Sequence, residues 1–196
     1  MLSKIFILMG KSATGKDSIM KKLVSCGLKK MILYTTRPIR DGEKEGREYH
    51  FITKDRFQEL KSAGKVIESR TYDTAHGRWS YFSVDDGEID LAAYNYIVIG
   101  TLETLESYRR YYGEDRVSPI YVEVDDGERL QRAIEREKKE AKPKYVELCR
   151  RFLADADDYS EEKLKEAGVE ENNRFVNEEL DACVKRIGGF IRENMG

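Results

Sequence analysis

A glycine-rich segment near the amino terminus has the spacing of a phosphate-binding loop. Gly10, Gly15 and Lys16 fit the pattern Gly-x-x-x-x-Gly-Lys, whereas Lys11 does not, because Ile5 stands where its first glycine would have to be. Backbone N–H groups of such a loop surround phosphate oxygens, and the lysine places a positive charge beside the terminal phosphates. We therefore predict an ATP-binding loop; the alternative is a glycine-rich turn without chemical function. The residues expected to bind ATP in this loop are Gly10, Lys11, Ser12, Ala13, Thr14, Gly15, Lys16, Asp17 and Ser18.

Asp17 occupies the position at which this motif usually has a Ser or Thr whose hydroxyl ligates Mg²⁺. Mg²⁺ prefers oxygen ligands and usually takes one or two carboxylates. We therefore expect Mg²⁺ as the cofactor that accompanies ATP, with Asp17 as its candidate ligand. The alternative is that Asp17 caps the helix that follows the loop.

Arg37 and Arg40 form a second group suited to phosphate. They lie on either side of Pro38, which favours a rigid, non-helical turn. Two guanidinium groups in such a turn can hold a phosphate through paired hydrogen bonds. This segment is therefore a candidate phosphate site, and the alternative is a pair of solvated surface arginines.

A third group of arginines lies between residues 129 and 151. Arg132 and Arg136 are four residues apart and share one face of a predicted helix. Pro143 ends that helix, and Arg150 and Arg151 belong to the next one. The pair of helices could bring guanidinium groups to a phosphate, or it could be a charged surface pair whose arginines contact neighbouring glutamates.

Short apolar runs alternate with helical patterns along most of the chain. This alternation predicts a parallel sheet with helices on both faces, an α/β fold of three layers. The rhythm breaks between residues 36 and 84, which we interpret as a small mixed insertion with a short helix at 55–63. The expected strands are 5–9, 31–34, 96–99, 117–124 and 174–176, and the expected helices are 15–26, 102–112, 127–140, 144–167 and 178–194.

Composition restricts the possible partners and cofactors. The 196 residues favour one domain, and a formal net charge of −2 gives no basic excess that would indicate nucleic acid binding. Three separated cysteines and two histidines argue against a disulfide framework or a zinc site, which suits a reducing, cytoplasmic location. The apolar run at 5–9 is too short for a membrane span or a signal peptide.

The phosphate loop, "TTRPIR" (residues 35–40), "GREYHF" (residues 46–51) and Glu68 together resemble the guanylate kinase family. The resemblance extends over residues 3 to about 192. It implies a P-loop α/β/α core at 1–35, 85–125 and 168–196, a nucleoside-monophosphate-binding insertion at 36–84 and a helical lid at about 126–151. It also implies ATP-dependent phosphorylation of GMP or dGMP to the diphosphate.

The resemblance assigns further site residues. The catalytic set is Lys16, Arg37, Arg40, Arg132, Arg136 and Arg151, with Arg150 as a substitute for Arg151. The acceptor would contact Arg37, Arg40, Tyr49, Glu68, Tyr81, Ser83 and Thr101, and Asn177 would lie near the adenine. In this set Glu68 accepts hydrogen bonds from the N1 and N2 donors of guanine.

Several positions depart from the family pattern. Phe82 stands between Tyr81 and Ser83, where the family usually has glycine. No carboxylate lies between Asp90 and Glu103, although the family places one at the end of the third strand of its sheet. Glu68 is then the one clear guanine-recognising residue. Two alternatives follow: a kinase of another nucleotide or small phosphorylated acceptor, or a guanylate-kinase-like module that binds proteins without catalysis.

Overall fold

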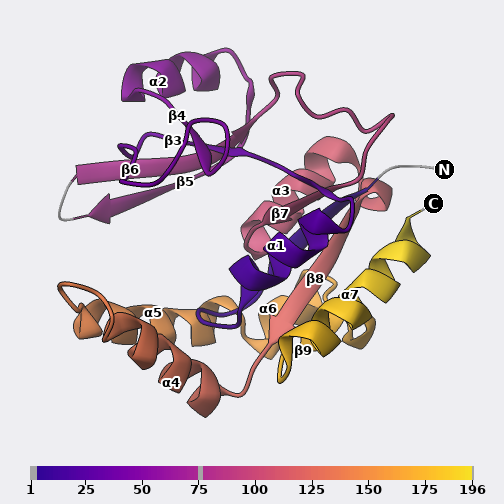
Figure 1. The fold of residues 1–196 in the computed structure, drawn as a ribbon. Coiled ribbons are helices and arrows are strands. Elements are labelled where there is room, and N and C mark those ends of the chain that lie inside the picture. The colour runs from indigo at the N-terminus through magenta and orange to yellow at the C-terminus, as the bar shows by residue number, and fades with distance from the viewer. Residues whose placement is uncertain (1–3, 75–76, 196) are drawn as a thin grey trace.

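Two β-sheets organise residues 4–74 and 77–195, which are the residues described in this computed structural model (Figure 1). The larger sheet has five parallel strands in the order β2-β7-β1-β8-β9, so the strand that leads into the phosphate loop lies at its centre. Its apolar strands are buried on both faces, as expected for a covered parallel sheet. The bounds are β1 (Ile5–Met9), β2 (Lys29–Lys30), β7 (Tyr96–Ile99), β8 (Val117–Glu123) and β9 (Arg174–Val176).

Helices cover both faces of this sheet and complete the three predicted layers. Alternate residues of β1 point to opposite faces. Phe6 and Leu8 pack in one core cluster with α1 (Lys16–Ser25) and α7 (Leu180–Asn194). Ile5 and Ile7 pack in the other with α3 (Leu102–Tyr112) and α6 (Glu161–Glu166).

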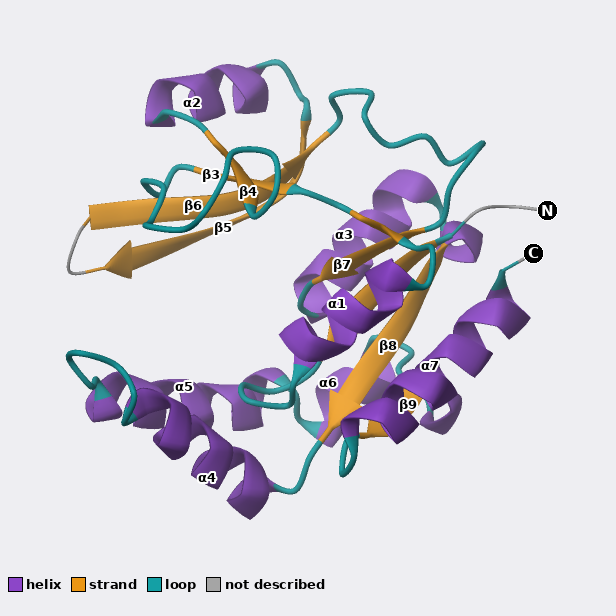
Figure 2. Ribbon diagram, viewed as in Figure 1, coloured by secondary structure: helices purple, strands orange, loops and turns teal. Residues whose placement is uncertain are grey.

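The insertion is a second, mixed sheet with its own small core. Its strand order is β4-β3-β6-β5, and β3 pairs parallel with β4 and antiparallel with β6. The helix α2 contributes Phe57 and Leu60, which pack with Phe82 of β6. Figure 2 shows this sheet and α2 set apart from the five-stranded sheet. The bounds are β3 (Leu33–Thr35), β4 (Tyr49–Phe51), α2 (Lys54–Ser62), β5 (Val66–Thr74) and β6 (Gly77–Val84).

The strand predicted at 31–34 is wrong in its bounds, because the chain passes between the two sheets there. β2 ends at Lys30, and Met31 is still attached to the parallel sheet through its N–H, which donates to the Ile97 carbonyl at 2.9 Å. Two residues later β3 pairs with the insertion sheet. An uninterrupted apolar run gives no local signal for such a change of partner.

The predicted lid is a helix pair, but its second helix is shorter than expected. α4 (Asp126–Glu137) is followed by α5 (Tyr145–Asp158), and α6 begins after a break instead of continuing to 167. Ser160 causes the break, because its side chain accepts the Lys163 N–H as the N-cap of α6. Short 3-10 turns stand at Glu114–Arg116 and Glu171–Asn173. Within the described ranges every helix is too short or too polar to span a bilayer.

Candidate active site

The phosphate loop connects β1 to α1 in the way its spacing predicts. Gly10 has φ +147°, and a Cβ there would lie 2.5 Å from the carbonyl oxygen of Val122 on β8. Gly15 has φ +91°, and a Cβ there would lie 2.7 Å from the amide nitrogen of Asn177. Both glycines are therefore required by positive φ and by close approach of a neighbour.

Lys16 points into its own loop. Its Nζ donates to the carbonyl oxygens of Gly10 at 2.7 Å and Lys11 at 2.8 Å. Burial lowers the pKa of Lys16 to about 8, and the charges of Arg129 and Arg136 act in the same direction. Lys11 instead pairs with Asp126 of α4 at 3.5 Å, so it connects the loop to α4.

Asp155 of α5 places a carboxylate on the phosphate loop. Its Oδ2 accepts the Ser12 N–H at 2.7 Å and lies 3.1 Å from Nη1 of Arg129. Arg129 is fully buried, donates from Nε to Asp126 at 2.6 Å and stacks its guanidinium 3.8 Å from the Phe152 ring centroid. A loop N–H suited to a phosphate oxygen therefore binds a carboxylate of the chain itself.

Sequence reasoning missed both Asp155 and Arg129. Each sits in a charged helix among similar residues, and the contact between Asp155 and Ser12 joins positions 143 residues apart. The one available signal was that Arg129 precedes Arg132 by three residues, which places it on a neighbouring part of the same helix surface. Its complete burial could not be deduced from that spacing.

Asn177 holds the phosphate loop through a buried side-chain hydrogen bond. Its side chain is buried, and Nδ2 donates to the Thr14 carbonyl at 2.8 Å. Arg132 also approaches this region, since Nη2 lies 3.4 Å from the Asn177 carbonyl and 2.9 Å from Glu128. The predicted contact of Asn177 with adenine stays a prediction; the structure shows a bracing contact to the loop.

Arg37 and Arg40 of the insertion lie in different environments. Arg37 is buried and forms paired hydrogen bonds with Glu43 at 2.8 and 2.9 Å, whereas Arg40 is exposed and only its backbone N–H contacts Glu43. These hydrogen bonds raise the pKa of Arg37 and lower the pKa of Glu43. The Arg37 guanidinium also lies 5.6 Å from the Tyr49 ring centroid.

A cavity of about 610 Å³ joins the first turn of α1 to the insertion. Asp17, Tyr49, Tyr81, Arg70 and Ile99 are among the residues that line it. The two tyrosine rings are 5.6 Å apart, centroid to centroid. The structure thus brings the predicted loop residue Asp17 and two predicted acceptor residues to one cavity.

Asp17 does not cap α1. Gly15 is the N-cap, and no described side chain caps this helix end with a hydrogen bond. Asp17 lies in the first turn, where the helix dipole favours a negative charge. The alternative assignment of Asp17 as the cap is therefore wrong.

The remaining predicted acceptor residues lie deeper in the insertion or at its border with the core. Glu68 is buried beside Arg70, and burial raises the pKa of its carboxyl group. Ser83 is buried next to them on β6. Thr101 is the N-cap of α3 and lines a second cavity, of about 560 Å³, together with Arg70.

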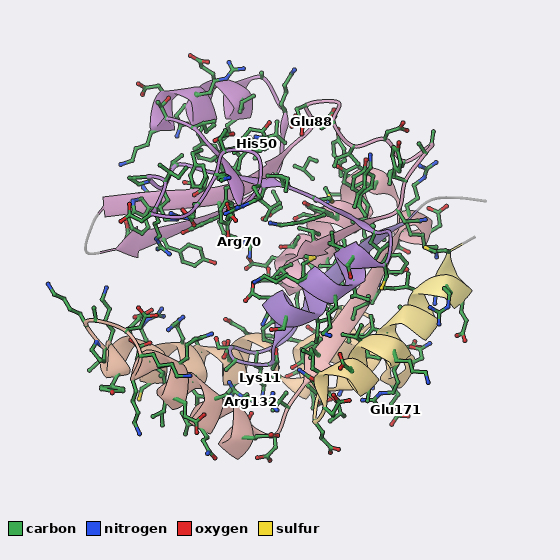
Figure 3. The ribbon with its side chains drawn as sticks, viewed as in Figure 1. Lys11, His50, Arg70, Glu88, Arg132 and Glu171 are labelled. Carbon is green, nitrogen blue, oxygen red and sulfur yellow. The ribbon has the colours of Figure 1, made fainter. Side chains whose placement is uncertain are left out.

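The lid arginines are less closely gathered than predicted. Arg150 forms paired hydrogen bonds with Glu147 at 2.8 Å, and Arg151 lies 3.8 Å from the same carboxylate. Arg136 is exposed on α4. Lys11 pairs with Asp126 at the start of α4, and Figure 3 labels Lys11 and Arg132 at this end of the molecule. Of the predicted lid arginines, Arg132 contacts Asn177, the residue whose side chain donates to the loop carbonyl of Thr14.

The fold and site together define a P-loop α/β protein, with an insertion sheet and the helix pair α4 and α5 around one phosphate loop. Residues 2–81 match the sequence model of the guanylate kinase family. The guanylate kinase of Neisseria gonorrhoeae (strain ATCC 700825 / FA 1090) is 36% identical over 97 residues, which are 48% of this chain and 45% of the relative. The amino-terminal part of the chain is thus similar in sequence to the guanylate kinase family.

Other comparisons find the same family. The guanylate kinase of Schizosaccharomyces pombe is 38% identical over 68 residues, 33% of this chain and 34% of the relative. The chain thus matches less than half of the length of these curated relatives. A crystal structure of guanylate kinase from Anaplasma phagocytophilum superposes with a TM-score of 0.67 at 19% identity, covering 99% of this chain and 87% of that one. This superposition confirms the predicted fold class.

Proposed function

We propose that the chain transfers the γ-phosphoryl group of ATP to GMP or dGMP and forms the diphosphate. The observation that carries this proposal is the cavity of about 610 Å³ that Asp17, next to the loop lysine, shares with Tyr49 and Tyr81 of the insertion. ATP bound at the loop would direct its terminal phosphate toward an acceptor phosphate held at these tyrosines. The cavity reaches from the first turn of α1, directly after the loop, to the insertion.

The chemistry that these residues would perform is positioning and charge stabilisation. A monophosphate acceptor is already anionic, so no general base is needed. Lys16 would bind the terminal phosphates of ATP, and Arg37 and Arg40 would bind the acceptor phosphate. Arg37 would exchange its contact with Glu43 for that phosphate, because the carboxylate now occupies its paired donors.

The lid would supply the remaining positive charge. Arg132, Arg136 and Arg151 would approach the transferred group when α4 and α5 close over the substrates, and closure would exclude water. Arg136 lies near enough to Lys16 for its charge to lower the pKa of that lysine. Arg151 is partly exposed and only loosely paired with Glu147.

Asp17 fits the role of a Mg²⁺ ligand in one respect: it presents an exposed carboxylate at the cavity beside the loop lysine. Within residues 4–74 and 77–195, no three His, Cys, Asp or Glu side chains converge as a metal site would require. The ion would therefore be held by Asp17 together with the phosphates, as Mg²⁺ commonly is. When bound, it would neutralise phosphate charge.

Titrating Mg²⁺ at saturating ATP tests this assignment. Asp17→Ala should require more Mg²⁺ for half-maximal activity, whereas Asp55→Ala, an exposed first-turn carboxylate of α2, should not. An unchanged Mg²⁺ titration for Asp17→Ala would remove Asp17 from the proposed site. Mn²⁺-dependent relaxation of water protons at fixed ATP gives a second readout that does not depend on turnover.

The activity itself is tested with the purified chain, ATP and a panel of monophosphates. GMP and dGMP should be phosphorylated faster than AMP, CMP and UMP, and Lys16→Met should abolish all transfer. Turnover of a different acceptor, with GMP and dGMP inert, would replace the proposed substrate. Absence of any affinity for an ATP analogue in calorimetry would instead indicate a binding module without catalysis.

A further inference from the structure

Glu68 and Arg70 form an ion pair with poor geometry inside the insertion. They are two residues apart on β5 and therefore point to the same face of the sheet. The Nε of Arg70 lies 3.4 Å from Oε2 of Glu68, and its Nη2 lies 3.5 Å from Oε1. Only 18% of the Arg70 side chain and 4% of the Glu68 side chain are exposed.

A pair this buried needs short, well-aligned hydrogen bonds to offset its desolvation. Here both contacts are long, and Nε of Arg70 makes no hydrogen bond with any residue that the structure describes. The guanidinium therefore has donors that its present partner does not satisfy. A buried, unsatisfied donor costs free energy until a partner arrives.

Arg70 lies where a bound acceptor would meet it. It lines both the 610 Å³ cavity that contains Tyr49 and Tyr81 and the 560 Å³ cavity that contains Thr101. Figure 3 shows Arg70 on the side of the insertion sheet that faces the core and the lid. A monophosphate bound at the tyrosines would extend its base along this wall.

The edge of guanine offers two kinds of group. O6 and N7 are acceptors that suit the paired donors of arginine, and N1 and N2 carry the donors that Glu68 is expected to accept. Glu68 alone would leave O6 without a donor. Adenine carries an amino group in place of O6, so the same guanidinium would face a donor.

We propose that Arg70 is a specificity-determining residue that donates to O6 and N7 of guanine while Glu68 accepts from N1 and N2. The inference rests on the proposed function, and it names how that site distinguishes its base. Entry of guanine would replace the two long Glu68–Arg70 contacts by hydrogen bonds to the base. Glu103, which lines the second cavity, is the further carboxylate that acts on Glu68. The same cavity is also lined by Glu106, Asp158, Lys163 and Glu166.

The test compares Arg70→Ala with the wild type, using GMP, AMP and 2-aminopurine riboside monophosphate, which lacks both O6 and the N1 proton but keeps N2 and N7. Because the missing N1 proton affects both proteins alike, the wild type and the variant are compared on each nucleotide separately. We expect the KM for GMP to rise about five- to 150-fold, the range that one paired arginine–guanine contact is worth, with kcat little changed. The analogue without O6 should lose much less, and the preference for GMP over AMP should shrink. Arg56→Ala, an exposed arginine of α2, is the matched control and should change none of these values.

Two outcomes would overturn the inference. An unchanged or improved KM for GMP in Arg70→Ala would mean that Arg70 only neutralises Glu68. Equal losses for GMP and for the analogue without O6 would mean that Arg70 has a structural effect, which Arg70→Met and thermal denaturation would reveal independently.

Equilibrium binding separates this inference from the proposed function. If the wild type binds GMP but does not phosphorylate it, the proposed activity fails, and calorimetry of GMP with Arg70→Ala still tests the contact. If the wild type phosphorylates GMP and the variant binds it equally well, the inference about Arg70 fails alone.

Discussion

The carboxylate of Asp155 should compete with ATP for the phosphate loop. Its Oδ2 accepts the Ser12 N–H at 2.7 Å, and a phosphate oxygen bound by that N–H must displace it. A hydrogen bond to a charged group contributes about 1.5–3 kcal/mol, and one to a neutral group about 0.5–1.5 kcal/mol. Asp155→Asn should therefore lower the cost of displacement by about 1–1.5 kcal/mol, which corresponds to about five- to tenfold tighter binding of ATP.

Calorimetry with a non-hydrolysable ATP analogue at pH 7 measures this change. The pH must lie below 8 because the charge of Asp155 helps to keep Lys16 protonated, and its removal lowers the pKa of Lys16 further. Asp157→Asn is the matched control on the same helix, since Asp157 is exposed and pairs with Lys163. An unchanged or weaker affinity in Asp155→Asn would refute the competition.

Stability should change in the opposite direction. Arg129 is fully buried and loses one charged partner in Asp155→Asn, although it keeps Asp126 at 2.6 Å. We expect the free energy of unfolding to fall by about 1–3 kcal/mol, measured by urea denaturation without nucleotide. A variant that binds ATP more tightly and is also more stable would show that the Arg129–Asp155 contact does not stabilise the fold.

Three further predictions concern single residues. The dissociation constant of the ATP analogue should rise about tenfold from pH 7 to pH 9, because Lys16, with a pKa of about 8, loses its proton over this range. Lys16→Arg should remove that rise, because arginine stays charged. An equal rise in both proteins would contradict the assignment of the rise to Lys16. Gly10→Ala should lower the free energy of unfolding by more than about 1 kcal/mol, because its Cβ would lie 2.5 Å from the Val122 carbonyl. The melting temperature should fall with it, and an unaltered melting temperature would exclude this clash. Glu43→Gln should also lower the melting temperature at pH 7. Arg37 depresses the pKa of Glu43, so the stabilising contribution is present above the ordinary value of 4.5 and lost as acid protonates the folded carboxyl; the gap from wild type should close on acidification, and a constant gap would argue against the ion pair.

Local patterns in the sequence were sufficient for the phosphate loop and for the layered core. The spacing of Gly10, Gly15 and Lys16 places the loop between a buried strand and a helix, and the apolar periodicities identify most elements. These features depend on neighbours within one or two turns, which is the distance over which sequence patterns carry information. The predicted strand at 31–34 failed because the choice between two sheets depends on distant partners.

The sequence by itself therefore determined which residues can bind phosphate and their order along the chain. Only the tertiary structure decided which side chains these residues contact in the folded protein. Asp155 reaches the loop, Glu43 holds Arg37, and Arg70 lies against Glu68. Each contact depends on which helix or strand face is buried and what it packs against. An excess of charged residues allows many such pairs, and packing selects the few that form at the site.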